Sequence, residues 1–174
     1  QSAGLTALEA GLIGIPSALL SAISSNWAGR RVKEYGRKIV VLGLSLAITG
    51  LMLNIGVILL YQFFSINIWW MLLTLTFFGI GQGLVVSPNQ TLTLAEVPIS
   101  YAGSSGAIMQ TGQRLGTAIG IAAVTAIVFG LLPYTSWHVA VIAGFITIIL
   151  FLLLALSMAV KDLRDRGKAT HAQH

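Results

Sequence analysis

The sequence predicts an all-α, polytopic membrane protein with five transmembrane helices. Of its 174 residues, 56% are hydrophobic and only 9% are charged, and the mean hydropathy is +0.87. A soluble domain carries roughly 25% charged residues, so this chain lacks the polar side chains that would cover a water-facing surface. The apolar residues also gather in runs of about 19 residues or more, each long enough to cross a hydrocarbon core about 30 Å thick. We therefore expect the lipid bilayer to be the main partner of this chain.

The charge pattern argues against a nucleic-acid partner. The formal net charge is +5, but the basic residues lie in two clusters beside apolar runs, which fits retention at the cytoplasmic side of a membrane. Cysteine is absent, so disulfides and thiolate metal sites are excluded, and we expect no cofactor and no metal. The chain begins at Gln1 and shows no signal peptide, so we expect it to be a piece of a longer protein.

The first two spans are separated by a basic segment. The first is expected at about residues 6–25, where Thr6 and Glu9 have the spacing of a capping box. Residues 26–38 then contain five of the basic residues and a single acid, Glu34. The second span, at about residues 39–61, is almost entirely aliphatic. Its main polar residue, Asn54, is expected to make an interhelical hydrogen bond.

The third span, at about residues 68–86, contains Gly79, Gly81 and Gly83 with Gln82 among them. A nucleotide-binding loop is a weak interpretation, because no strand precedes the glycines and no lysine follows them. Close packing against neighbouring helices explains three small residues better. A polar connection at residues 87–100 follows this span.

The fourth helix, at about residues 104–132, carries two distinct stripes. Its polar residues recur at i, i+3, i+4 and i+7 and so share one face: Gln110, Gln113, Arg114 and Thr117. A second stripe, suited to the close approach of a neighbouring helix, has small residues at every fourth position: Gly112, Gly116 and Gly120. Because hydrocarbon offers a polar face no hydrogen bonds, that face must meet water, protein or a solute. We therefore expect this helix to line a pathway through the membrane.

The fifth span, at about residues 139–160, is nearly uniformly apolar and is expected to face lipid, and residues 161–174 form a charged tail. With five spans, the basic segment 26–38 and the tail lie on the same side. The connections near Gln62 and Pro133 lie on the other side and contain no Lys or Arg. By the positive-inside rule, the C-terminus is therefore cytoplasmic.

Two segments carry a family resemblance. Residues 29–38 resemble the basic loop motif of the major facilitator superfamily, in the copy between its eighth and ninth core helices. Gly29, Gly36, Arg37 and Lys38 match that pattern, whereas Lys33 and Glu34 replace its Asp-Arg pair. Residues 87–122 are similar to the region of the tenth and eleventh core helices in the fourteen-span drug:proton antiporters of that superfamily, and this is the more specific match.

The resemblance implies a fold, a function and a set of site residues. The chain would form most of the C-terminal six-helix bundle of a transporter in the cell membrane (a plasma or inner membrane), with the N-terminal half absent. The first, third and fourth spans would face a central cavity, lined by Gln82, Gln110, Gln113, Arg114 and Thr117. The substrate would be a hydrophobic or cationic small molecule, and proton coupling would depend on acids in the missing half.

Two other classes of function are open to the same sequence. A structural or assembly subunit needs only helices that pack, which the glycine stripe alone would allow, but a polar stripe containing Arg114 would be a costly addition to it. An intramembrane enzyme needs an acid, base, nucleophile or metal set inside the spans. His138, His171 and His174 lie instead at a span end or in the tail, so we expect no catalytic residues and no enzyme.

Overall fold

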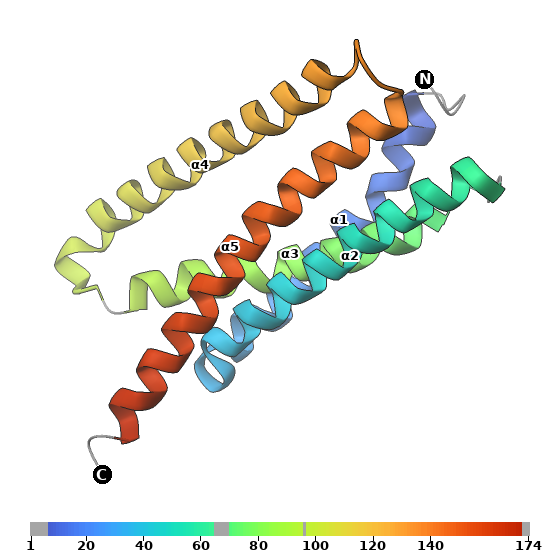
Figure 1. Ribbon diagram of the computed structural model, residues 1–174. Coiled ribbons are helices and arrows are strands. Elements are labelled where there is room, and N and C mark those ends of the chain that lie inside the picture. The colour runs from blue at the N-terminus through green and yellow to red at the C-terminus, as the bar shows by residue number, and fades with distance from the viewer. Residues whose placement is uncertain (1–6, 65–69, 96, 172–174) are drawn as a thin grey trace.

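The protein is a bundle of long α-helices (Figure 1). The computed structural model describes residues 7–64, 70–95 and 97–171, and these contain no β-strand. The helices are α1 (Ala7–Tyr35), α2 (Arg37–Phe64), α3 (Trp70–Ala95), the short 3-10 helix η1 (Ile99–Tyr101), α4 (Ala102–Leu131) and α5 (Trp137–His171). The Thr6–Glu9 cap expected from the sequence lies outside the residues whose side chains are described.

Helix α3 packs against both α1 and α2 and holds them together. Its glycines make this possible, because a Cβ on Gly79 would collide with the Ser17 carbonyl of α1, and one on Gly83 with the Ser21 carbonyl and Ser24 hydroxyl. Toward α2, a Cβ on Gly81 would lie 2.5 Å from the Ala47 nitrogen. The close packing predicted for the third-span glycines is thus confirmed.

Hydrogen bonding reinforces the α1–α3 contact. The Ser24 hydroxyl has one proton to donate, and its Oγ lies within hydrogen-bonding distance of two carbonyl oxygens, that of Ser21 in its own helix at 3.1 Å and that of Ile80 in α3 at 3.2 Å. Such a bond requires two backbones to come very close, which the neighbouring glycines of α3 permit. The third-span glycines therefore serve both packing and polar contact.

Helix α5 lies against α2, whereas α4 contacts mainly α5 and meets α3 only near η1 (Figure 1). The buried apolar side chains are concentrated on α2, with Leu51 at 2% exposure and Ala47 at 3%. By contrast, α4 contains no buried residue. Its contact with α5 includes Gly144, where an added Cβ would lie 2.7 Å from Val128 Cγ2.

Several boundaries differ from those expected. The basic segment is mostly helical, and the break between α1 and α2 is reduced to Gly36, whose φ of +52° lies in the left-handed region. Helix α3 continues to Ala95, through Pro88 in its interior. Helix α5 continues through the charged segment to His171. The helices therefore extend beyond the apolar spans that the sequence outlines.

Asn54 also differs from its expected role. Its side chain is fully buried, and the hydrogen bond described for its Nδ2 is to the Gly50 carbonyl of the same helix, at 3.5 Å. Its Oδ1 has no hydrogen-bond partner among the described residues. An intrahelical bond thus replaces the predicted interhelical one.

Length and composition identify a multi-pass membrane protein. Within the described residues, four helices are long and apolar enough to cross a membrane, and they correspond to α2, α3, α4 with the preceding η1, and α5. Helix α1 is absent from this set. The side chains of residues 7–11 and 13 of this helix are not among those described, and its remaining part ends in Arg30, Arg31, Lys33 and Glu34. Its passage through the membrane stays a prediction.

Candidate functional site

The polar stripe of α4 lies on an open surface. Gln110, Arg114 and Thr117 are exposed and Gln113 is half-buried. The Thr117 hydroxyl donates to the Gln113 carbonyl of its own helix at 2.8 Å, so its donor is satisfied locally and one acceptor face stays available. The stripe is therefore displayed outward by the helix rather than used to hold this bundle together.

Arg114 is the charged residue of this stripe. Arg114 lies about 18 Å along the helix axis from Ala102, the first residue of α4, at a rise of about 1.5 Å per residue. No hydrogen bond or ion pair to another described residue is found for it. An arginine near a bilayer centre costs about 2.5–3.5 kcal/mol on insertion scales, and a planar guanidinium presents five donors. A polar environment that compensates this cost must therefore come from outside the described chain or from the lipid headgroups.

The glycine stripe of α4 behaves differently from the glycines of α3. No heavy atom of the described residues lies within 4 Å of a Cβ built on Gly112, Gly116 or Gly120. Within the described chain, then, these three positions face open space. No helix of the described residues uses them as a packing face.

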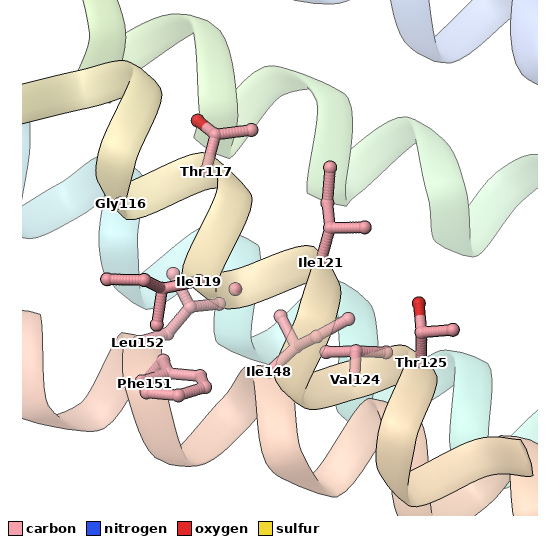
Figure 2. A pocket seen from close by; sticks show the side chains of 10 residues that line it. Gly116, Thr117, Ile119, Ile121, Val124, Thr125, Ile148, Phe151 and Leu152 are labelled. Atoms are coloured by element: carbon pink, nitrogen blue, oxygen red, sulfur yellow. The ribbon is translucent and has the colours of Figure 1, made fainter. Parts of the chain in front are cut away.

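A groove between α4 and α5 runs beside this stripe (Figure 2). Its volume is about 660 Å³, and Gly116, Thr117 and Gly120 are among its lining residues. Figure 2 shows Ile119 and Val124 of α4 on the side of Ile148 and Phe151 of α5, with Thr117 pointing to the other side. The groove is thus almost wholly apolar, and Thr117 is the one member of the polar stripe at its edge.

Gln82 is exposed on α3 but is not brought to the α4 stripe. Helices α3 and α4 meet near η1 and then diverge (Figure 1). The five polar residues named from the sequence therefore occupy two surfaces of the described chain: Gln82 on α3, and Gln110, Gln113, Arg114 and Thr117 on α4.

The residues of the basic loop motif have separate structural roles. A Cβ on Gly29 would lie 2.8 Å from Ser87 Oγ of α3, so this glycine permits the close approach of α1 and α3. Gly36 supplies the left-handed turn. Arg37 Nη1 lies 2.5 Å from Asp162 Oδ2 of α5, and Lys38 is exposed.

Asp162 is a partner that sequence reasoning missed, because it was grouped with the charged tail. A signal was present: it is the first acid after the fifth apolar run, at the same end of the bundle as the basic segment. For metals, no group of three His, Cys, Asp or Glu residues comes together in the described part of the chain.

In comparisons with known proteins, nearly the whole chain matches the model of one family. Residues 1–173 match the model of the Major Facilitator Superfamily. No curated protein and no solved structure gives a significant match. The match covers every helix described above.

Proposed function

Because the chain belongs to the Major Facilitator Superfamily, a family of membrane transporters, we propose that it forms most of the C-terminal half of a secondary transporter that exports hydrophobic or cationic compounds by alternating access. We place it in the fourteen-span drug:proton antiporter branch, on the similarity of residues 87–122. Transport by such proteins uses a site near the middle of the membrane between two bundles of helices.

The observation that carries this proposal is the outward polar face of α4. A charged residue and two glutamines on a helix without a single buried residue serve no purpose in packing this bundle. They suit a helix whose other side borders a water-filled cavity, since hydrocarbon would leave them without hydrogen bonds. Arg114, Gln110, Gln113 and Thr117 would line that cavity from α4, and Gln82 would do so from α3.

In the intact protein, the second wall of the cavity is supplied by a part outside this sequence. The resemblance to the drug:proton antiporters implies that acids coupling transport to protons lie mainly in that part, and none of the described apolar runs encloses an Asp or Glu. Gly112, Gly116 and Gly120 form the face against which a further helix packs. The protein lies in the cell membrane with the basic ends of α1 and α5 in the cytoplasm.

The test is efflux by Arg114 variants of the intact protein at equal expression. Hydrogen bonds to charged groups contribute about 1.5–3 kcal/mol, so we expect Arg114→Ala to lower the efflux of a lipophilic cation about tenfold or more. A lysine keeps the charge but loses the planar fork of donors, so Arg114→Lys should restore only part of the activity.

Arg164→Ala is the matched control, because Arg164 is an exposed arginine on α5 outside the α4 stripe. It should leave efflux unchanged. Full efflux by Arg114→Ala would mean that Arg114 merely extends toward the lipid headgroups, and the proposed cavity role would be wrong. The structural-subunit alternative would be supported if no variant of the stripe altered efflux.

A further inference from the structure

A polar pocket lies between α1 and α3, away from the α4 stripe. Its volume is about 500 Å³, within the range of about 300–1,000 Å³ that is usual for small-molecule sites. Four of its lining residues have polar side chains, and the other two add little apolar surface: Ser25, Asn26, Arg30 and Ser87, with Ala22 and Gly29. This pocket is therefore the opposite in character of the apolar groove between α4 and α5.

Hydrogen-bond donors predominate in the pocket. The Arg30 guanidinium has five N–H donors and the Asn26 amide has two. The hydroxyls of Ser25 and Ser87 add one donor each. No Asp or Glu is among the lining residues. One fixed positive charge beside several neutral donors, without a carboxylate, suits the binding of an anion.

These donors are not used within the described part of the chain. The four polar side chains make no hydrogen bond or ion pair to another described residue. The neighbouring Arg31 differs, because its Cζ lies 4.8 Å from the centre of the Trp27 ring and its charge is engaged in a cation–π contact. Of the two adjacent arginines, only Arg30 offers its charge to the pocket.

Gly29 allows Ser87 to belong to the pocket. A Cβ on Gly29 would lie 2.8 Å from Ser87 Oγ, so a larger residue would push this hydroxyl aside. The glycine thus lets a donor of α3 lie beside the donors of α1. The pocket depends on the close packing of these two helices.

The position and the walls of the pocket favour a soluble occupant. Ser87 lies about 12 Å along the axis from Ala95, where the apolar stretch of α3 ends, at about 1.5 Å per residue. Donors at this depth need water or a polar solute as a partner, since hydrocarbon offers no acceptor. A phospholipid would also need an apolar wall for its acyl chain, and Ala22 and Gly29 do not supply one.

We propose that this pocket binds a small tetrahedral oxyanion, of which inorganic phosphate is the simplest example. The planar fork of Arg30 donates to the oxyanion, and the Asn26 amide and Ser87 hydroxyl donate to its remaining oxygens. A carboxylate has only two oxygens and would leave part of this donor set without a partner. The site is separate from the α4 stripe, so its existence does not depend on the export function proposed above.

Isothermal titration calorimetry of the intact protein in detergent, at constant ionic strength, tests the proposal. The probes are inorganic phosphate, sulfate, acetate and chloride. We expect phosphate and sulfate to bind about fivefold or more tightly than acetate, because they engage additional donors, and chloride to bind most weakly. Equal binding of all four anions would show unspecific attraction to positive charge and would overturn the proposal. So would a lack of phosphate binding, because another part of the protein would then fill the pocket.

Two arginine variants separate the site from the general positive charge. Arg30→Gln should weaken phosphate binding about tenfold, because it removes a charged donor. Arg31→Gln is the matched control, since it removes the same charge from the adjacent residue, whose guanidinium lies over Trp27. This control should change the affinity less than about twofold, because salt screens charges that do not contact the anion. An equal loss of affinity in both variants would refute the site.

Two neutral variants test the site even if Arg30→Gln does not fold. Ser87→Ala removes one donor and should weaken phosphate binding about threefold. Gly29→Ala keeps every donor but displaces the Ser87 hydroxyl, so it should have a similar effect. Unchanged affinity in both variants would contradict the proposal.

A lipid probe distinguishes the remaining source of a phosphate group. Dihexanoyl-phosphatidic acid carries its phosphate on two acyl chains, for which the pocket has no apolar wall. It should therefore bind no more tightly than inorganic phosphate. Much tighter binding of this lipid, in competition with phosphate, would assign the pocket to a headgroup and would overturn the proposed soluble ligand.

Discussion

Gly81→Ala is the substitution whose effect on stability the structure specifies most directly. The new Cβ would lie 2.5 Å from the Ala47 nitrogen and 2.6 Å from the Gly43 carbonyl oxygen of α2. Ordinary contacts between such atoms are about 3.5–4.0 Å long, so the two helices would have to separate by about 1 Å. The obstructing atoms belong to the backbone and cannot turn aside as a side chain could.

The magnitude follows from two opposing terms. Overpacking of this kind typically costs about 1–3 kcal/mol, and replacing a helical glycine by alanine returns up to about 1 kcal/mol. We therefore expect a net destabilisation of about 1–2 kcal/mol. For a folding unit of about 150–250 residues that corresponds to a fall in Tm of about 2–8 °C, and the fall is smaller when a longer intact protein unfolds as one unit.

The assay is thermal unfolding of the intact protein in detergent, with Gly56→Ala as the matched control. Gly56 lies on α2, and no described heavy atom lies within 4 Å of a Cβ at that position. Gly56→Ala should therefore leave the Tm unchanged or raise it slightly. If Gly81→Ala were as stable as Gly56→Ala, the close α2–α3 contact would not exist in the form described.

Three other predictions concern the connections and the surface of α4. Gly36→Ala places a side chain at a φ of +52°, which costs about 1–2 kcal/mol for most residues, so the Tm should fall. The Tm of Gly36→Asn should fall less, because asparagine tolerates the left-handed region better than alanine does. Equal Tm values for the two variants would argue against a left-handed turn. Gly116→Leu should lower the Tm of the intact protein, with transport falling in proportion to folded protein, if another helix packs on this stripe; an unchanged Tm would refute that packing role. A cysteine at Gln62 should react with an impermeant thiol reagent from outside the cell, and one at Lys168 only after permeabilisation; the reverse labelling would overturn the proposed orientation.

The helical class and the membrane location followed from the sequence because both depend on local composition. In lipid, a single apolar run can satisfy the hydrogen bonds of its own backbone N–H and C=O groups only by forming a helix. The packing of the third-span glycines was also predictable, since three small residues within five positions leave two faces of a helix open to close approach. The residues of the basic motif were recognisable by their spacing.

Helix boundaries were less predictable, because hydropathy marks where a chain leaves lipid and not where its helix ends. The basic segment is polar yet helical up to Tyr35, since arginine, lysine and glutamate are good helix formers. Only Gly36 interrupts it. In the same way α5 continues past the last apolar residue to His171.

Tertiary structure alone decided which residues meet. Two glycine stripes look alike in the sequence, but Gly79 and Gly83 lie against the α1 backbone whereas Gly112 and Gly116 face open space, because spacing specifies a face and not its neighbour. Arg37 and Asp162 are far apart in the chain, and their contact depends on the crossing of α2 and α5. Local sequence thus determined what each helix could present, and the packing of the helices determined what each one contacts.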